Sequence, residues 1–199
     1  MRKVILQEFV TLDGLAAGEN GSVDFVPAST RGDESFGQHQ IAFMDSLDTI
    51  LLGRVTYEMF SEYWPNVTSG DDKPFADKLN AIPKIVFSRT LDRAPWGDWD
   101  EARIREDAAK EIAALKSRSG RDVVIWGSIS LAQSLMAARL IDEYQIIICP
   151  VVLGTGKPLF KQQSDAQGLE LVDTRTFDHG AALLSYTTHG TNRNPRTDI

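Results

Sequence analysis

Three short motifs that combine glycine, hydroxyl and arginine side chains follow apolar runs in this chain, and their chemistry suits phosphate binding. The motifs are Gly53-Arg54-Val55-Thr56, Ser88-Arg89-Thr90 and Gly127-Ser128-Ile129. Glycine lets backbone N–H groups approach an anion closely, and the first turn of a helix adds free N–H groups and the positive end of its dipole. Arg54 and Arg89 could hold a terminal phosphate through paired hydrogen bonds. Together the motifs suit a ligand with several phosphates.

Each motif also has a simpler interpretation. Serine and threonine are ordinary N-cap residues, and glycine often ends a strand. For one motif alone this interpretation is the better one. Three such motifs in a single sheet favour a nucleotide site instead.

Two better-known phosphate signatures are missing. No G-x-G-x-x-G sequence follows the first apolar run, which excludes the ordinary dinucleotide fingerprint. Gly154-Thr155-Gly156-Lys157 lacks the spacing of a phosphate loop and is followed by Pro158 in place of Ser or Thr. A tight turn is the better interpretation of that segment.

The elements that must position these motifs follow from the apolar pattern. Strands are predicted over residues 4–10, 49–52, 84–88, 123–126, 143–152, 169–177 and 181–188. The first four runs are almost continuously apolar, which is typical of parallel strands covered on both faces. Amphipathic stripes between them predict helices, one of which includes Ile104, Ala108, Ile112 and Leu115. The last two runs flank Asp178-His179-Gly180 and predict a hairpin. The expected fold is therefore three-layer α/β, with a mostly parallel twisted sheet and a C-terminal antiparallel hairpin.

Composition narrows the class of protein. The chain has 199 residues, 42% of them hydrophobic, and a net charge of −7. This predicts one domain over residues 1–189 and a disordered tail over 190–199. The negative charge disfavours nucleic-acid binding, and no apolar run is long enough to span a membrane. A single cysteine, Cys149, fits a cytoplasmic location, and three scattered histidines give no metal-site spacing.

Five motifs in the same order and spacing resemble the dihydrofolate-reductase-like superfamily. They are Thr11-Leu12-Asp13-Gly14, the segment 52–58, the segment 124–128, Leu140-Ile141-Asp142-Glu143 and the segment 150–156. The chain is most similar to the C-terminal reductase domain of the riboflavin-biosynthesis deaminase/reductase (RibD C-terminal type), from about residue 3 to 188. The resemblance implies an eight-stranded sheet that binds NADPH along its strand ends and reduces a heterocyclic C=N or carbonyl group.

The resemblance also assigns cofactor contacts. It places Gly53, Arg54, Val55 and Thr56 at the first phosphate-binding helix, Ser88 and Arg89 at the adenosine-side phosphate, and Gly127, Ser128 and Ile129 beneath the pyrophosphate. Residues 13–21 are similar to a flexible lid, where backbone near Val10 and Ala17 would hold the carboxamide. The two arginines favour NADPH over NADH, because a 2′-phosphate needs cationic partners. Relatives of this branch often pair, so a homodimer is expected.

A hydride acceptor needs a proton donor nearby. Asp33 and Glu34, just before the first long helix, are the candidates, although acids in a first helical turn are also ordinary dipole partners. Trp126 stands where riboflavin reductases generally carry an acid, which puts the riboflavin-pathway substrate in doubt. It could stack on a flat ring or pack in the core. Tyr63 and Trp64 could line a substrate cleft or pack equally well.

The function hypothesis is an NADPH-dependent reductase that transfers hydride to a pterin-like or aminopyrimidine ring. It would be of the dihydrofolate reductase or 5-amino-6-(5-phosphoribosylamino)uracil reductase type. The alternative is a non-catalytic protein that binds NADP(H) or another nucleotide on the same scaffold. The expected partners are a small heterocyclic substrate and a second copy of the chain, with no nucleic acid and no membrane.

Overall fold

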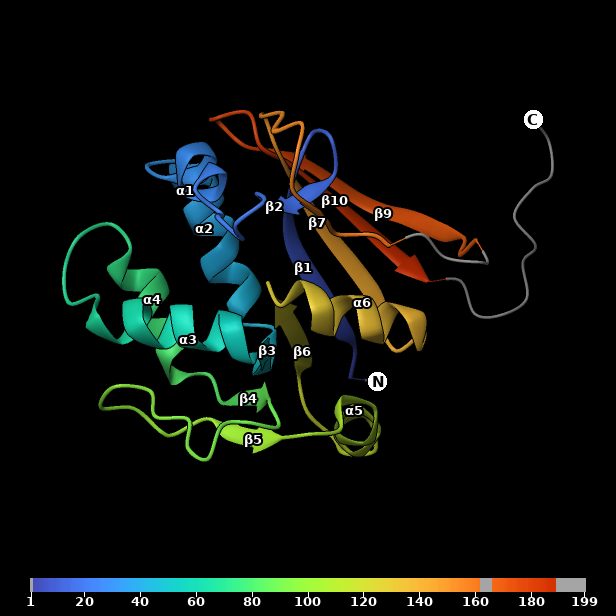
Figure 1. Cartoon of the computed structure of the whole chain (residues 1–199). Coiled ribbons are helices and arrows are strands. Elements are labelled where there is room, and N and C mark those ends of the chain that lie inside the picture. Colours follow the sequence, from blue (N-terminus) through green and yellow to red (C-terminus); the bar gives the residue numbers. More distant parts are fainter. Residues whose placement is uncertain (1, 162–165, 189–199) are drawn as a thin grey trace.

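The computed structural model describes residues 2–161 and 166–188, so the tail predicted over 190–199 lies outside the described part. One eight-stranded sheet has the order β5-β4-β3-β6-β1-β7-β10-β9, and β2 pairs separately with β8 (Figure 1). The strands are β1 (Val4–Thr11), β2 (Leu15–Ala17), β3 (Leu47–Gly53), β4 (Lys84–Phe87), β5 (Arg103–Arg105), β6 (Asp122–Trp126), β7 (Glu143–Cys149), β8 (Lys157–Pro158), β9 (Leu169–Thr176) and β10 (Ala182–Thr188). The helices are α1 (Phe25–Thr30), α2 (Glu34–Met44), α3 (Arg54–Tyr63), the 3-10 turn η1 (Trp64–Asn66), α4 (Lys73–Ala81), α5 (Ala108–Lys116) and α6 (Ile129–Ala137).

The sheet confirms the predicted fold class. Strands β5, β4, β3, β6, β1 and β7 are parallel neighbours, whereas β10 runs antiparallel to β7 and β9 antiparallel to β10. The central strands are buried on both faces, as their nearly continuous apolar sequences predict. The C-terminal hairpin extends beyond the helices at one end of the sheet (Figure 1).

Two large apolar cores, one on each face of the sheet, hold the layers together, and a smaller cluster around Ile147, Leu183 and Phe36 joins β7 and β10 to α2. One core joins the sheet to α5 and α6 around Leu6, Ile112 and Leu135. The other joins it to α2, α3 and α4 around Leu52 and Leu79. Successive side chains of a strand point to opposite faces, so the parity of a residue decides which core it enters.

One predicted helix begins later than expected. Ile104 lies in β5, not in α5, because Asp107 ends the extended segment and caps the helix by accepting a hydrogen bond from the Lys110 N–H at 3.0 Å. The residues Arg103 and Arg105 on either side of Ile104 are exposed, as expected of an edge strand. The strand predicted over 143–152 is also shorter, since β7 ends at Cys149 just before Pro150.

Within the described residues, no helix is both long and apolar enough to cross a membrane.

Candidate functional site

The strand order places the predicted phosphate motifs along one edge of the sheet. Strands β4, β3, β6 and β1 are consecutive and parallel, so their carboxyl ends lie side by side. Ser88 follows β4, Arg54 follows β3 and Gly127 follows β6. In sheets of this kind, ligands bind at the carboxyl ends of the strands. The three motifs are therefore brought together where a ligand would be expected.

The turns after β3 and β6 are hydrogen-bonded to each other. The Gly53 N–H donates to Ser128 Oγ at 2.7 Å, and the Ser128 N–H donates to Thr56 Oγ1 at 2.8 Å. Gly127 and Ser128 both have left-handed backbone, with φ of 54° and 62°. A Cβ at Gly127 would lie 3.0 Å from the Thr56 side chain, so the close approach favours glycine. The two βα turns thus form one fixed unit, which we call the cradle (Gly53–Thr56 with Gly127–Ile129).

Both helices of the cradle begin with N–H groups that no side chain caps. Neither Gly53 nor Ser128 caps its helix through a side-chain hydrogen bond. The first four N–H groups of a helix lack intrahelical partners, and the dipole makes that end attractive to anions. Arg54 lies at the same end, in an exposed ion pair with Glu58 at 2.8 Å. Because an exposed pair contributes little stability, Arg54 can exchange Glu58 for a phosphate.

Arg89 lies beside a cavity on the α6 side of this edge. The cavity has a volume of about 510 Å³ and lies between the carboxyl ends of β4 and β5 and helices α5 and α6. Leu131 and Leu135 supply apolar walls, and Glu106 supplies an acidic side chain. Ser88 stabilises the turn after β4, since its Oγ accepts hydrogen bonds from the N–H groups of residues 90 and 91, both at 3.1 Å.

The segment predicted as a flexible lid, residues 13–21, is anchored at its start. Strand β2 pairs with β8, and a Cβ at Gly156 would lie 2.3 Å from the Ala17 carbonyl oxygen. Asp13 accepts hydrogen bonds from the Gly154 N–H at 2.8 Å and from Thr11 Oγ1 at 2.6 Å. The Thr11 bond, with the backbone bonds, holds the pKa of Asp13 below its usual value. Asp13 therefore joins two loops, besides shaping its own turn.

The backbone that faces the cradle from β1 is that of Phe9, not of Val10. The Lys3 carbonyl accepts from β6, at Val123, while the Val4 carbonyl accepts from Asp142 at the start of β7. Backbone groups of successive residues in a strand point to alternate neighbours, so odd positions of β1 face β6 and even positions face β7. Pairing with β6 stops at Gln7, which leaves the Phe9 N–H and C=O facing the gap above Gly127. This backbone is adjacent to Val10, near which the carboxamide contact is expected, and that contact stays a prediction.

Glu8 is a buried carboxyl near the end of β1 that the sequence analysis did not single out as a candidate. Its side chain is 6% exposed, and its Oε1 accepts a hydrogen bond from the Phe9 N–H at 3.2 Å. Burial raises the pKa of Glu8 to about 8, so the carboxyl carries its proton at neutral pH. A glutamate in the middle of a buried strand is the signal that could have identified it, because glutamate side chains are seldom fully buried unless they are paired.

The structure shows Asp33 as the N-cap of α2. Its Oδ1 accepts from the Phe36 N–H at 2.9 Å and from Ser35 Oγ at 2.7 Å, and its Oδ2 accepts from the His179 N–H at 2.7 Å. Burial alone would raise the pKa of Asp33, but these hydrogen bonds outweigh it and keep the pKa below its usual value. Glu34 is exposed and accepts from Gln38 Nε2 at 2.9 Å. A proton-donor role for either residue stays a prediction.

The three residues predicted to bind substrate belong to one aromatic row. Ring centroids lie 4.9 Å apart between Tyr63 and Trp64, 4.8 Å between Trp64 and Phe75, and 6.1 Å between Phe75 and Trp126. Trp126 is buried at the inner end, where its indole N–H donates to Gln7 Oε1 at 2.8 Å. Tyr63 is exposed at the outer end. For Trp126 the structure shows the core-packing alternative, while Tyr63 and Trp64 present ring faces nearer the surface.

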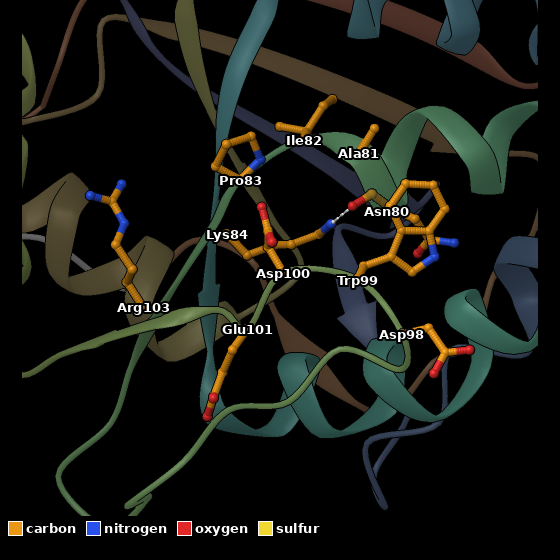
Figure 2. Close-up of a pocket in the computed structure, with 10 residues that line it drawn as sticks. All are labelled: Asn80, Ala81, Ile82, Pro83, Lys84, Asp98, Trp99, Asp100, Glu101 and Arg103. Carbon is orange, nitrogen blue, oxygen red and sulfur yellow. Dashed lines mark hydrogen bonds between the residues drawn. The ribbon is translucent and has the colours of Figure 1, made fainter.

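A second cavity lies at the opposite edge of the sheet, beside the start of β4 (Figure 2). It measures about 570 Å³ and is lined by Asn80, Lys84, Trp99 and Asp100 among others. Lys84 Nζ donates to the Asn80 carbonyl oxygen at 2.5 Å and lies 4.5 Å from the Trp96 ring centroid. Burial lowers the pKa of Lys84 to about 7. Because ligands of parallel sheets bind at the carboxyl ends of the strands, we assign this cavity no part in the candidate site.

Among the described residues, no group of three or more His, Cys, Asp or Glu side chains is placed to hold a metal ion.

Comparison with known proteins agrees with this architecture. The RibD C-terminal domain family matches residues 2–183. Two uncharacterized Bacillus subtilis proteins are similar along nearly their whole length. YyaP is 34% identical over 190 residues, covering 95% of this chain and 96% of YyaP. YwjB is 33% identical over 183 residues, covering 92% and 96%.

Solved structures share the fold at lower identity. A Shewanella protein assigned to riboflavin biosynthesis is 22% identical with a TM-score of 0.74, covering 94% of this chain and 99% of its own. The Thermotoga maritima diaminohydroxyphosphoribosylaminopyrimidine deaminase/5-amino-6-(5-phosphoribosylamino)uracil reductase is 14% identical with a TM-score of 0.63, covering 94% of this chain and 57% of its own. The fold is thus the dihydrofolate-reductase-like fold of RibD-type reductases. On the extent of the family match and of the two relatives, this chain belongs to the RibD C-terminal domain family.

Proposed function

We propose that the protein is an NADPH-dependent reductase that acts on a flat heterocycle of the pyrimidine or pterin class. The observation that carries the proposal is the cradle, because two uncapped helix N-termini meet there at the carboxyl ends of parallel strands. Family membership supports the reductase class and a nicotinamide cofactor, which the cradle alone does not distinguish from other nucleotides.

The described residues fit such a cofactor from end to end. The cradle would hold the pyrophosphate, and Arg89 with its cavity of about 510 Å³ would hold the adenosine end. Val55, which is 69% exposed at the start of α3, offers an apolar contact at the mouth of the cradle. When bound, the cofactor supplies hydride, while the chain orients it and excludes water through the anchored segment 13–21. The outer rings of the aromatic row, Tyr63 and Trp64, meet edge to face, and the exposed Tyr63 ring would offer an aromatic contact for the substrate.

The first experiment is a fluorescence titration with NADPH, followed by a screen of pterins and aminopyrimidines for NADPH oxidation. We expect binding at micromolar concentration and oxidation with at least one ring class. Failure of NADPH to bind at that concentration would remove the proposal.

The cofactor preference has its own test at Arg89. We expect Arg89→Ala to weaken NADPH binding about tenfold or more, since the substitution removes a charge-assisted phosphate contact worth about 1.5–3 kcal/mol. The affinity for NADH, which has no 2′-phosphate, should fall much less. Equal losses for the two cofactors would refute the assignment of Arg89 to the 2′-phosphate.

A binding protein without chemistry is the second candidate, and the state of Asp33 favours it. Every acceptor bond made by Asp33 is structural, and its carboxyl holds a proton poorly at neutral pH. A protein that binds NADPH tightly but oxidises it with no heterocycle in the screen would support this candidate.

We further propose a homodimer formed through the C-terminal hairpin. Strand β9 is an edge strand, and Leu171 and Val172 are 50% and 53% exposed. An exposed edge strand offers unpaired N–H and C=O groups to another chain, and these two apolar side chains would be covered by the pairing. Sedimentation velocity should give a dimer, and Val172→Lys should shift it toward monomer. A wild-type chain that sediments as a monomer at high micromolar concentration would refute the pairing.

A further inference from the structure

Glu8 has a hydrogen-bonding deficit that the fold does not explain. Among the described residues, its Oε2 is a buried side-chain oxygen without a hydrogen-bond partner. A buried polar atom left unpaired costs about 1–3 kcal/mol, so native proteins seldom keep one without a use. The nearby polar side chains of Thr11 and Asp13 both have partners, since Thr11 bonds Asp13 and the Leu15 N–H, and Asp13 also accepts from the Gly154 N–H. Of the buried side-chain atoms without a partner in the described residues, the other is His39 Nε2, so Glu8 Oε2 is the one such atom on β1.

The position of Glu8 relates it to the cradle. Gln7 pairs with Trp126, so Glu8 is level with Gly127, the first residue beyond β6. Its side chain leaves β1 on the face that carries Leu6 and Val10, which is the face covered by α6. Its Oε1 turns toward the gap beyond β6, because it accepts from the Phe9 N–H, which points there. Glu8 and Phe9 together present a polar pair at the inner end of the strand-end edge.

The chemistry of this pair selects a small amide. A protonated carboxyl offers one O–H donor and one acceptor oxygen, and the Phe9 C=O in the same gap offers a second acceptor. A primary amide presents one acceptor oxygen and two N–H donors, so it can satisfy both sides. A phosphate or carboxylate would leave the acceptors of Glu8 and Phe9 without donors.

We propose that the Glu8 carboxyl is a contact for the carboxamide of the nicotinamide ring, and that it selects this cofactor among nucleotides that the cradle would otherwise accept. The inference rests on the proposed function, since it assumes that a nicotinamide cofactor occupies the strand-end edge. It adds what the cradle lacks, namely a group that recognises the redox-active end of the ligand.

The test compares two ligands on three proteins. NADPH and 2′-phospho-ADP-ribose, which lacks the nicotinamide, are titrated calorimetrically into the wild type, Glu8→Gln and Glu8→Leu. For Glu8→Leu we expect the Kd for NADPH to rise about tenfold, which corresponds to about 1.4 kcal/mol, and the Kd for 2′-phospho-ADP-ribose to stay unchanged. Glu8→Gln should bind both ligands like the wild type, because its amide also donates and accepts.

A second measurement keeps the proposal testable if Glu8→Leu does not fold. The 3-acetylpyridine analogue of NADPH replaces the carboxamide N–H groups with a methyl group, and we expect the wild type to bind it several-fold more weakly than NADPH. Equal affinity of the wild type for NADPH and the analogue would overturn the role of Glu8. The same conclusion would follow if Glu8→Leu lost affinity equally for NADPH and for 2′-phospho-ADP-ribose. A wild type that binds neither NADPH nor 2′-phospho-ADP-ribose would instead overturn the proposed function itself.

Discussion

Glu8 makes the stability of the protein depend on pH in an unusual direction. Its pKa is 4.5 in an unfolded chain and about 8 in the folded protein, because burial penalises the carboxylate. Between these values the unfolded chain has released the proton and the folded protein still holds it. Folding then takes up a proton, so the free energy of unfolding falls as pH rises through this window and levels off above pH 8.

The magnitude follows from the size of the window. At about 1.4 kcal/mol for each pH unit, raising the pKa from 4.5 to about 8 costs roughly 5 kcal/mol at pH 8 and above. Domains of this size have a free energy of unfolding of about 5–15 kcal/mol. Glu8→Gln keeps the shape and removes the titration, so it should stabilise the protein by several kcal/mol at pH 8 and by almost nothing at pH 4.5.

Urea unfolding followed by circular dichroism at pH 5, 6, 7 and 8 measures this difference directly. The same substitution at the exposed Glu62 is the matched control for the change in net charge. The difference between Glu8→Gln and the wild type should grow steadily over the four pH values. A difference that stays constant across the series would show that the Glu8 carboxyl is not protonated in the folded protein.

Three further changes test other parts of the structure. Lys84→Met should raise the free energy of unfolding by several kcal/mol at pH 6 and much less at pH 10. Burial lowers the pKa of Lys84 from 10.5 to about 7, so folding releases a proton between these values and the penalty is largest below pH 7. Chemical denaturation at both pH values checks this, and an equal effect at the two would contradict it. Ser128→Ala should lower the free energy of urea unfolding by about 1–3 kcal/mol and weaken NADPH binding, since the Gly53 N–H loses its acceptor. An unchanged affinity for NADPH would argue against the cradle as the cofactor site. Asp33→Ala should lower the free energy of unfolding by about 1–2 kcal/mol through loss of the α2 cap, and Asp33→Ser should recover most of that stability. If Asp33→Ser regains stability but not NADPH-oxidation activity, the result would point to a proton-transfer role for Asp33.

The sheet and the phosphate motifs were within reach of sequence analysis because their signals are local. Apolar runs without alternation indicate strands covered on both faces, and Gly127-Ser128 directly before a helical stripe indicates a turn. Given a parallel sheet, the carboxyl ends must share an edge, which brings Arg54, Ser88 and Gly127 together. The error at Ile104 arose because its spacing also fits a helix, while the Asp107 cap decides where the helix starts.

Other features depend on contacts that no local pattern encodes. The join between Asp13 and Gly154 spans 141 residues, and the Asp33 bond to the hairpin at His179 spans 146. Which backbone of β1 faces the gap depends on where the pairing with β6 ends, and no local pattern in the sequence fixes that point. Glu8 was visible as a charged residue inside an apolar run, but its missing partner appears only when its neighbours are in place.

The hydrogen bonds of the cradle join residues 72 and 75 positions apart. A nucleotide seated across them would bridge two crossover units that fold from distant stretches of chain. Its binding free energy would therefore oppose global unfolding, and not only the fraying of one loop. In amide hydrogen exchange, β3 and β6 should then gain protection together and by the same factor when ligand is added.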